Sequence, residues 1–472
     1  MKRNIKIILA LWLSVLLVVS CMACQSEQED IYDQFAGSET SQEESQAEGS
    51  AAPEEETQEE ALSGELTISV KFPTSESSGL GMVAAEFEEQ HPGVTVTIQP
   101  GLTMEEAYSG DTALFQAAEK SYTEALAVEL TSGAGADLID VGSLSFNRYA
   151  ESGVLCDLYT LCDWEETFPE EEYFRGILDA PATQGKLYAL VVTANPSACW
   201  LNRPVASQLG AEELEELTAS KLVELYGQAV SQGLVEESFV TDEEMVAATF
   251  VKNQFPDLLD LEGETAAFDT PEFVALLEGL HTLKFTCTVE EGELYQSTTG
   301  SYPVLDNTTR LVASAALSQG ELMGYLTGQI DGILLPEATE QGSRLFTGSL
   351  YAVNSASQQQ ELAWEFLKFW VSWQEEDSAE DSSFYDRYGG EYPVNRAIAQ
   401  QKLQVELGKL YDEELAEKVL DLLGSANALD QFDPLLYQNF QPILADYFDR
   451  DLTDAATCAT QLQERADLYL KE

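Results

Sequence analysis

The sequence predicts a doubly wound α/β fold, in which helices cover both faces of largely parallel sheets. The folded part is expected to form two domains. Between residues 65 and 141, alternating and helical hydrophobic patterns follow one another as strand, helix, strand, helix, strand. Of the 472 residues, 44% are hydrophobic, which is enough to fill large cores. About 400 residues remain after a leader and a polar linker, a length typical of two domains.

The first 24 residues have the pattern of an export signal. Three basic residues precede an apolar run over 7–19. At about 1.5 Å per residue, this run falls short of the ~30 Å hydrocarbon core, so we expect a cleaved signal over 1–20. Val18-Val19-Ser20-Cys21 resembles the lipobox of bacterial lipoproteins, which predicts lipidation of Cys21. Lipidation at Cys24, an uncleaved anchor and ordinary secretion remain alternatives.

Charge separates a linker from the folded part of the chain. Residues 25–64 hold 13 of the 84 acidic residues and no Lys or Arg, so we expect 21–64 to be a lipidated cysteine followed by a disordered acidic linker. Residues 65–472 carry the other 71 acids against 20 bases. This field repels phosphate backbones and anionic lipid surfaces, so nucleic-acid binding is excluded and membrane contact is expected only through the anchor.

The first predicted domain opens with a βαβ unit. Leu66, Ile68 and Val70 alternate with polar residues as in a strand, and a helical pattern over 80–90 ends at Pro92-Gly93. A strand over 94–98 follows. A second helix over 114–130 and a strand over 136–141 complete this predicted domain.

Later segments are predicted from shorter signals. Strands are expected over 186–193, 302–305 and 350–353. A helix over 273–283 should begin after Thr270-Pro271, because proline fits the first helical position. Ser357 and Gln360 resemble a capping box for another helix, and a last helix should run from about 453 to 470.

Few residues point to catalysis, to a metal or to a cofactor. Gly79–Ala84 matches a dinucleotide fingerprint, but six residues separate it from the strand and the expected acid about 20 positions later is missing. The chain has two histidines and no CxxC pair, so a zinc site is not expected. Cys156 and Cys162 could close a small disulfide loop, and the five cysteines of the body leave at least one thiol free. We therefore expect no cofactor and no enzyme activity.

Several segments together resemble extracellular solute-binding proteins of family 1, the sugar receptors of ABC importers. Phe87-Glu88-Glu89-Gln90-His91-Pro92-Gly93-Val94-Thr95-Val96 is similar to the family's F-E-x-x-x-P-x-I-x-V segment. Further similar segments follow in the family's order: Ala136–Ile139 with Tyr149–Leu155, Gly185–Leu190, Trp200–Asn202, Ala352–Asn354 with Ala363–Leu367, and Asp467–Leu470. Val191 replaces the usual proline, and residues 295–340 match the family poorly.

The resemblance implies a periplasmic-binding-protein-like type II fold, with two doubly wound lobes joined by a hinge and a ligand cleft between them. Lobe I would comprise 65–190 and 350–395, and lobe II 191–349 and 396–472. Crossing segments are expected near 188–195, 343–350 and 393–396. Ligands of open α/β sheets lie beyond the carboxyl ends of strands, which indicates the same cleft.

Candidate ligand contacts are aromatic or polar residues expected in that cleft. Sugars stack their apolar ring faces on aromatic side chains and bond their hydroxyls to amides and carboxylates. The candidates are Phe72, Ser75, Glu76, Ser143, Phe146, Asn195, Asp306, Asn307, Phe432 and Tyr437.

The sequence and the resemblance together predict a monomeric, lipid-anchored receptor on the outer face of the cell membrane. It would bind a mono- or oligosaccharide and pass it to the transmembrane subunits of an ABC permease. Two alternatives remain open: a receptor of the same fold for a polyamine or another cation, which the acidic body would suit, and a surface carbohydrate-active enzyme. A structural surface protein is a further alternative.

Overall fold

A computed structural model describes residues 62–75, 78–142, 144–236, 238–240, 251–260, 263–286, 294–297, 300–303, 310–314, 317, 319–339, 342–373, 390–429 and 434–471. The chain divides into two units, Met1–Leu62 and Ser63–Glu472, and the elements below belong to the second. In this described part, no helix is both long enough and apolar enough to cross a bilayer.

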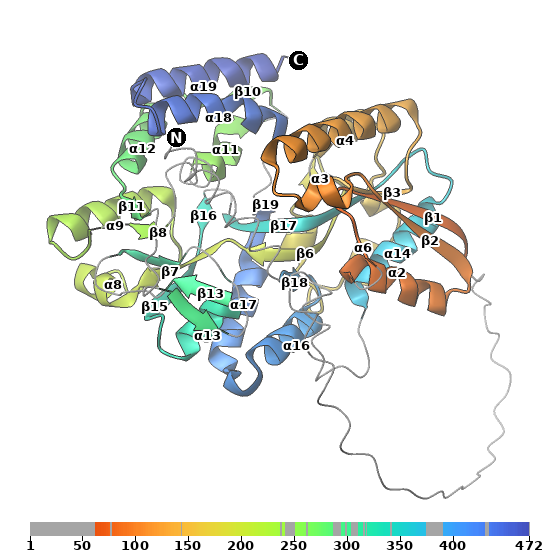
Figure 1. Cartoon of the computed structure of the whole chain (residues 1–472), viewed down its shortest axis with the longest axis horizontal. Coiled ribbons are helices and arrows are strands. Elements are labelled where there is room, and N and C mark those ends of the chain that lie inside the picture. The colour runs from red at the N-terminus through yellow and green to blue at the C-terminus, as the bar shows by residue number, and fades with distance from the viewer. Residues whose placement is uncertain are drawn as a thin grey trace, which may run out of the picture. The chain divides into compact units, whose positions relative to one another are not determined.

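The largest sheet in the described residues holds eight strands, six of them in the order β18-β6-β17-β3-β1-β2, with β16 and β19 paired to β17. The strands are β1 (Ser63–Val70), β2 (Gly93–Pro100), β3 (Leu138–Asp140), β6 (Leu190–Pro196), β16 (Ala338–Thr339), β17 (Gly342–Val353), β18 (Tyr392–Pro393) and β19 (Ala426–Leu429). β1, β2 and β3 are parallel, whereas β17 runs antiparallel to β3 and β6. Figure 1 shows these strands among the surrounding helices.

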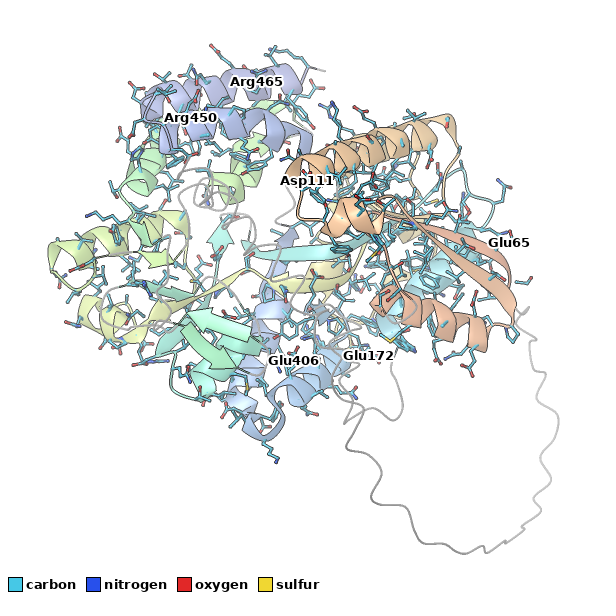
Figure 2. The ribbon with its side chains drawn as sticks, viewed as in Figure 1. Glu65, Asp111, Glu172, Glu406, Arg450 and Arg465 are labelled. Atoms are coloured by element: carbon cyan, nitrogen blue, oxygen red, sulfur yellow. The ribbon has the colours of Figure 1, made fainter. Side chains whose placement is uncertain are left out.

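The predicted βαβ unit is confirmed. β1 and β2 pair in register from Ser63↔Gly93 to Val70↔Pro100, and β3 pairs on the other side of β1. α2 (Gly79–Gln90) begins after Ser78, whose hydroxyl accepts a hydrogen bond from the Gly81 N–H. α4 (Thr112–Ser132) begins after Asp111, labelled in Figure 2, whose carboxylate accepts the N–H groups of the helix's first turn.

A second sheet, with strand order β14-β7-β15, anchors a separate core. Its strands are β7 (Ala198–Asn202), β14 (Val312–Ser314) and β15 (Gly332–Pro336). The buried residues around it come from these strands and from several helices, and include Leu201, Phe255, Phe440 and Tyr469. We call this cluster the β7 core. Only Ser197 separates β6 in the large sheet from β7 in the small one, so the chain passes between the sheets there.

The remaining elements connect and cover these sheets. The remaining helices are α3 (Met104–Tyr108), α5 (Phe146–Glu151), α6 (Trp164–Thr167), α7 (Arg175–Asp179), α8 (Arg203–Leu209), α9 (Ala219–Ser231), α11 (Lys252–Leu258), α12 (Pro271–His281), α13 (Gln319–Leu326), α14 (Gln360–Ser372), α16 (Arg396–Leu407), α17 (Glu413–Ser425), α18 (Pro434–Phe448) and α19 (Ala455–Tyr469), with 3-10 turns at Leu158–Thr160 and Gly408–Leu410. Short strand pairs are β4 (Ala182–Thr183) with β5 (Lys186–Leu187), β8 (Phe239–Val240) with β11 (Phe285–Thr286), β9 (Leu259–Asp260) with β10 (Thr265–Ala266), and β12 (Leu294–Ser297) with β13 (Gly300–Pro303).

Three predictions about elements need correction. The strand expected over 186–193 is two strands, because β5 turns back onto β4 through Gln184 and Gly185, which both have positive φ. The strand expected over 350–353 is the end of β17, which starts at Gly342. The capping box is also wrong: α14 has Gln359 as its N-cap with no side-chain bond, and the Ser357 hydroxyl donates to Asp137 and accepts the Gln359 N–H.

The disulfide considered between Cys156 and Cys162 is not formed. Both thiols are free, as are those of Cys199 and Cys458. Burial raises the pKa of the Cys458 thiol to about 12 and that of Cys199 well above its usual value, so neither is a ready nucleophile.

Candidate functional site

The carboxyl ends of β1 and β3 lie side by side, because the two strands are parallel neighbours. Phe72 and Ser75 follow β1, and both are exposed; the Phe72 side chain keeps 41% of its surface accessible. Phe146 follows β3 as the first residue of α5 and is only 7% exposed. The structure therefore brings the loops predicted to carry ligand contacts to one edge of the sheet.

Phe72 belongs to a group of three aromatic residues at this edge. Its ring stacks on that of Phe115 in α4, with centroids 6.2 Å apart and planes inclined by 12°. The Tyr108 ring of α3 lies 6.5 Å from Phe72 at 31°. We call Phe72, Tyr108 and Phe115 the aromatic platform. Tyr108 and Phe115 were not among the predicted contacts, and their sole sequence signal is that their helices follow the carboxyl end of β2.

A lysine and two carboxylates adjoin the aromatic platform. The Lys71 ammonium lies 5.0 Å from the Phe72 ring centroid and 5.4 Å from that of Phe115, and it forms an ion pair with Glu119. The Lys71 side chain is 13% exposed and that of Glu119 is 35% exposed, so the carboxylate is the more accessible partner. Apolar ring faces and hydrogen-bonding charges thus occur together, as sugar recognition requires.

Asp140, the last residue of β3, is the second carboxylate. Its Oδ1 accepts a hydrogen bond of 2.9 Å from the Gly142 N–H. Burial raises the pKa of Asp140 to about 6, although the Gly142 N–H and the Lys71 charge oppose this shift. Tyr122 of α4 and Tyr351, opposite Asp140 in β17, also interact with it. A carboxyl group with a pKa of about 6 can donate a hydrogen bond when it is protonated at lower pH, and only accepts when it is ionised at higher pH.

Asn195 lies in β6, opposite Phe346 of β17, one residue before the strand ends. Its side-chain oxygen is buried and has no hydrogen-bond partner among the described residues. A buried acceptor left unpaired is unfavourable by about 1–3 kcal/mol, so such a group is a candidate for bonding to a ligand hydroxyl. Two residues earlier, the Thr193 hydroxyl donates to Glu391 over 2.5 Å.

Of the other predicted contacts, the structure describes Tyr437. Tyr437 lies within α18, whereas we expected it to precede the final helices. It packs partly buried against the β7 core, and burial raises its pKa to about 12. The predicted contacts at Glu76, Ser143, Asp306, Asn307 and Phe432 lie outside the described residues.

A separate pocket of about 450 Å³ lies between α4 and the strands β1 and β2. Tyr122 lines it, but none of the predicted contacts and none of the aromatic platform does. In the described residues, no group of three or more His, Cys, Asp and Glu side chains could hold a metal ion. The His91 ring packs on Phe87, and His281 pairs with Asp451 at 3.3 Å.

This architecture is that of periplasmic-binding-protein-like solute-binding proteins, which confirms the predicted fold class. An extracellular solute-binding protein family 1 from Alicyclobacillus acidocaldarius covers 87% of this chain and 99% of its own, with 13% identity and a TM-score of 0.52. No protein-family model matches the sequence, and no curated protein does.

Two further solved structures show the same fold. A sugar transporter from Rhizobium etli, in an open conformation, covers 86% of this chain and 99% of its own, with 14% identity and a TM-score of 0.53. A cyclic alpha-maltosyl-1,6-maltose binding protein from Arthrobacter globiformis covers 87% of this chain and all of its own, with 13% identity and a TM-score of 0.52. At these identities the likeness is one of fold.

Proposed function

We propose that this chain is the lipid-anchored, extracellular substrate-binding component of an ABC importer. It binds a mono- or oligosaccharide in a cleft between two lobes and delivers it to the permease subunits. Lobe I comprises 65–190 and 350–395, and lobe II 191–349 and 396–472. The observation that carries the proposal is the aromatic platform with its exposed Phe72, beside Lys71 and Glu119, at the carboxyl edge of a solute-binding fold.

The ligand site combines the aromatic platform with Asn195 and the predicted loops. Stacking on Phe72 orients a sugar ring, and the Asn195 side-chain oxygen, which has no partner among the described residues, accepts from a hydroxyl. Ser75, Glu76, Ser143, Phe146, Asp306, Asn307, Phe432 and Tyr437 complete the proposed set. The chain performs no chemistry on its ligand, in keeping with solved neighbours that are named as binding proteins.

Thermal unfolding against a panel of sugars tests this function. A ligand at a hundredfold excess over its Kd stabilises the folded state by about 2.7 kcal/mol, so one sugar should raise the midpoint by several degrees. Putrescine and spermidine belong in the same panel, because 71 acids against 20 bases in 65–472 favour a cationic ligand as the second candidate. If an amine raises the unfolding midpoint and no sugar does, the ligand is a cation and the sugar proposal is wrong. Release of reducing ends from a polysaccharide would contradict the non-enzymatic role.

The anchor is tested separately. The signal would be cleaved before Cys21, leaving a lipidated cysteine on the acidic linker. Cys21→Ser should release the protein into the medium or leave it unprocessed, whereas Cys24→Ser should remain membrane-bound. If Cys21→Ser is still lipidated and Cys24→Ser is not, the lipid is attached to Cys24.

A further inference from the structure

Arg148 makes two contacts with the end of the chain. Its guanidinium carbon lies 3.9 Å from the centroid of the Tyr469 ring. Its Nη2 donates a hydrogen bond of 3.2 Å to the Tyr469 carbonyl oxygen. Arg148 lies in α5 and Tyr469 ends α19, 321 positions later in the sequence.

The two residues belong to different parts of the fold. α5 follows the carboxyl end of β3 in the large sheet, and Arg148 lies in α5 two residues after Phe146. Tyr469 is 6% exposed and is a member of the β7 core, whereas the buried residues of α5 do not belong to that core. The contact therefore ties a helix that follows the large sheet to the core around the small one.

The chemistry of the contact favours arginine. A planar guanidinium can stack on an aromatic ring and still donate from its edge. The last carbonyl groups of a helix lack partners within the helix and carry a partial negative charge, which a nearby cation stabilises. α19 has no basic residue in its own last turn, and Arg148 supplies that cation from another element.

We propose that Arg148 and Tyr469 form a clasp between α5 and the C-terminal helix α19. The clasp holds α5 against the β7 core before ligand arrives and positions Phe146, the first residue of α5. Arg148 is thus a positioning residue, and its effect on ligand affinity rests on the proposed function. Its effect on the ligand-free protein does not.

Arg148→Ala tests the clasp in the full chain without ligand. Amide hydrogen exchange in α5 and at the end of α19 should accelerate by roughly 5- to 30-fold, the factor expected for losing an interaction of one or two kcal/mol. The radius of gyration from small-angle X-ray scattering should also rise, by roughly 1 Å on the ~22 Å expected for a compact body of this length.

Matched variants separate the clasp from general damage. Tyr469→Phe keeps the ring and the carbonyl that Arg148 contacts, so exchange in α5 should stay close to that of wild type. Arg465→Ala removes an exposed arginine from the same helix (Figure 2) and should change neither readout. Arg148→Lys keeps the charge without the planar group and should fall between wild type and Arg148→Ala.

Two results would overturn the proposal. Exchange in Arg148→Ala equal to that in Arg465→Ala would mean that the contact contributes nothing. Faster amide exchange with an unchanged radius of gyration would mean that Arg148 stabilises α5 locally and does not hold it against the β7 core. If Arg148→Ala does not fold, Arg148→Gln, which keeps part of the stem and an amide donor, carries the same comparison. All readouts omit sugar, so a chain that bound no sugar would refute the proposed function and leave the clasp measurable.

Discussion

Phe72 is a large apolar side chain that the fold leaves 41% exposed while its ring contacts those of Phe115 and Tyr108. Phe72→Ala should weaken binding of the sugar identified by thermal unfolding by about tenfold or more, since aromatic stacking contributes roughly 0.5–1.5 kcal/mol beyond the area that it buries. Isothermal titration calorimetry measures this change.

The matched control for Phe72 is Met104, which is 61% exposed in α3 and lies outside the aromatic platform. Met104→Ala removes a similar apolar side chain and should leave the affinity unchanged. Equal affinity of Phe72→Ala and Met104→Ala would remove the platform from the binding site.

Asp140 should make stability depend on pH in a defined window. Its pKa is raised to about 6 in the folded chain, whereas an unfolded aspartate ionises near pH 4. Between about pH 4 and 6 the folded chain holds a proton that the unfolded chain has released, so the free energy of unfolding falls as pH rises. The Asp140 contribution to this fall is about 3 kcal/mol at most.

Asp140→Asn should remove that part of the pH dependence, because an amide accepts the Gly142 N–H and does not titrate. Urea unfolding at pH 4, 5, 6 and 7 gives the free energy of unfolding for both proteins. Glu124→Gln, which removes one exposed charge from α4, controls for net charge. A constant difference between Asp140→Asn and wild type across these pH values would contradict the expectation.

Among the elements, β2 stands at the end of the large sheet with one edge unpaired by any described strand. Backbone N–H groups of β2 donate hydrogen bonds to a side chain and to a turn carbonyl. The Val96 N–H donates to Glu88 of α2 over 2.7 Å, and the Val94 N–H donates to the His91 carbonyl over 2.8 Å. Pro100 has no N–H to offer. The strand is therefore poorly suited to pairing with another chain.

Glu88→Ala should expose the Val96 N–H and lose a charge-assisted hydrogen bond. We expect the free energy of unfolding to fall by about 1–3 kcal/mol and self-association to increase. Urea unfolding and light scattering measure the two effects. The neighbouring Glu89 is exposed, and Glu89→Ala should change neither. Scattering that is equal for both variants would show that Glu88 does not protect the edge.

The elements with strong local signals were predictable, and those decided by distant contacts were not. Leu66, Ile68 and Val70 alternate within β1 and are 0–4% exposed, because helices cover the sheet. Ser357 had the spacing of a cap, yet its hydroxyl bonds Asp137, which is 220 positions away in the sequence. β17 is longer than its hydrophobic pattern indicated because four strands pair along it.

The candidate site was predictable to a similar extent. Parallel strands place their carboxyl ends at one edge, so the loop with Phe72 could be chosen from the order of strands alone. Tyr108 and Phe115 could not, because their places depend on how α3 and α4 fold back beside β1. The burial of the Asn195 side-chain oxygen without a partner among the described residues likewise depends on packing that no short motif encodes.

At the scale of the whole molecule, net charge opposes compactness. With 71 acids against 20 bases in 65–472, the folded body repels itself. Raising NaCl from about 0.02 to 0.5 M shortens the Debye length from roughly 20 Å to 4 Å, so the unfolding midpoint should rise by several degrees. Differential scanning calorimetry measures the midpoint, with sucrose at matched osmolality as an uncharged comparison. A midpoint that falls with salt would show that favourable ion pairs outweigh the repulsion.

β17 also determines the order in which the chain can be completed. β3 ends at Asp140 and pairs with β1 on one side, but its second neighbour, Tyr351 to Val353 of β17, is synthesised only about 200 residues later. At 5–20 residues per second of synthesis, one edge of β3 stays unpaired for roughly 10–40 s. A chain in this state has an open strand edge and an unfinished core, which are features that chaperones bind. The nascent protein should therefore depend on protection until residue 353 has emerged, and truncations before Gly342 should aggregate, whereas the full-length chain should fold.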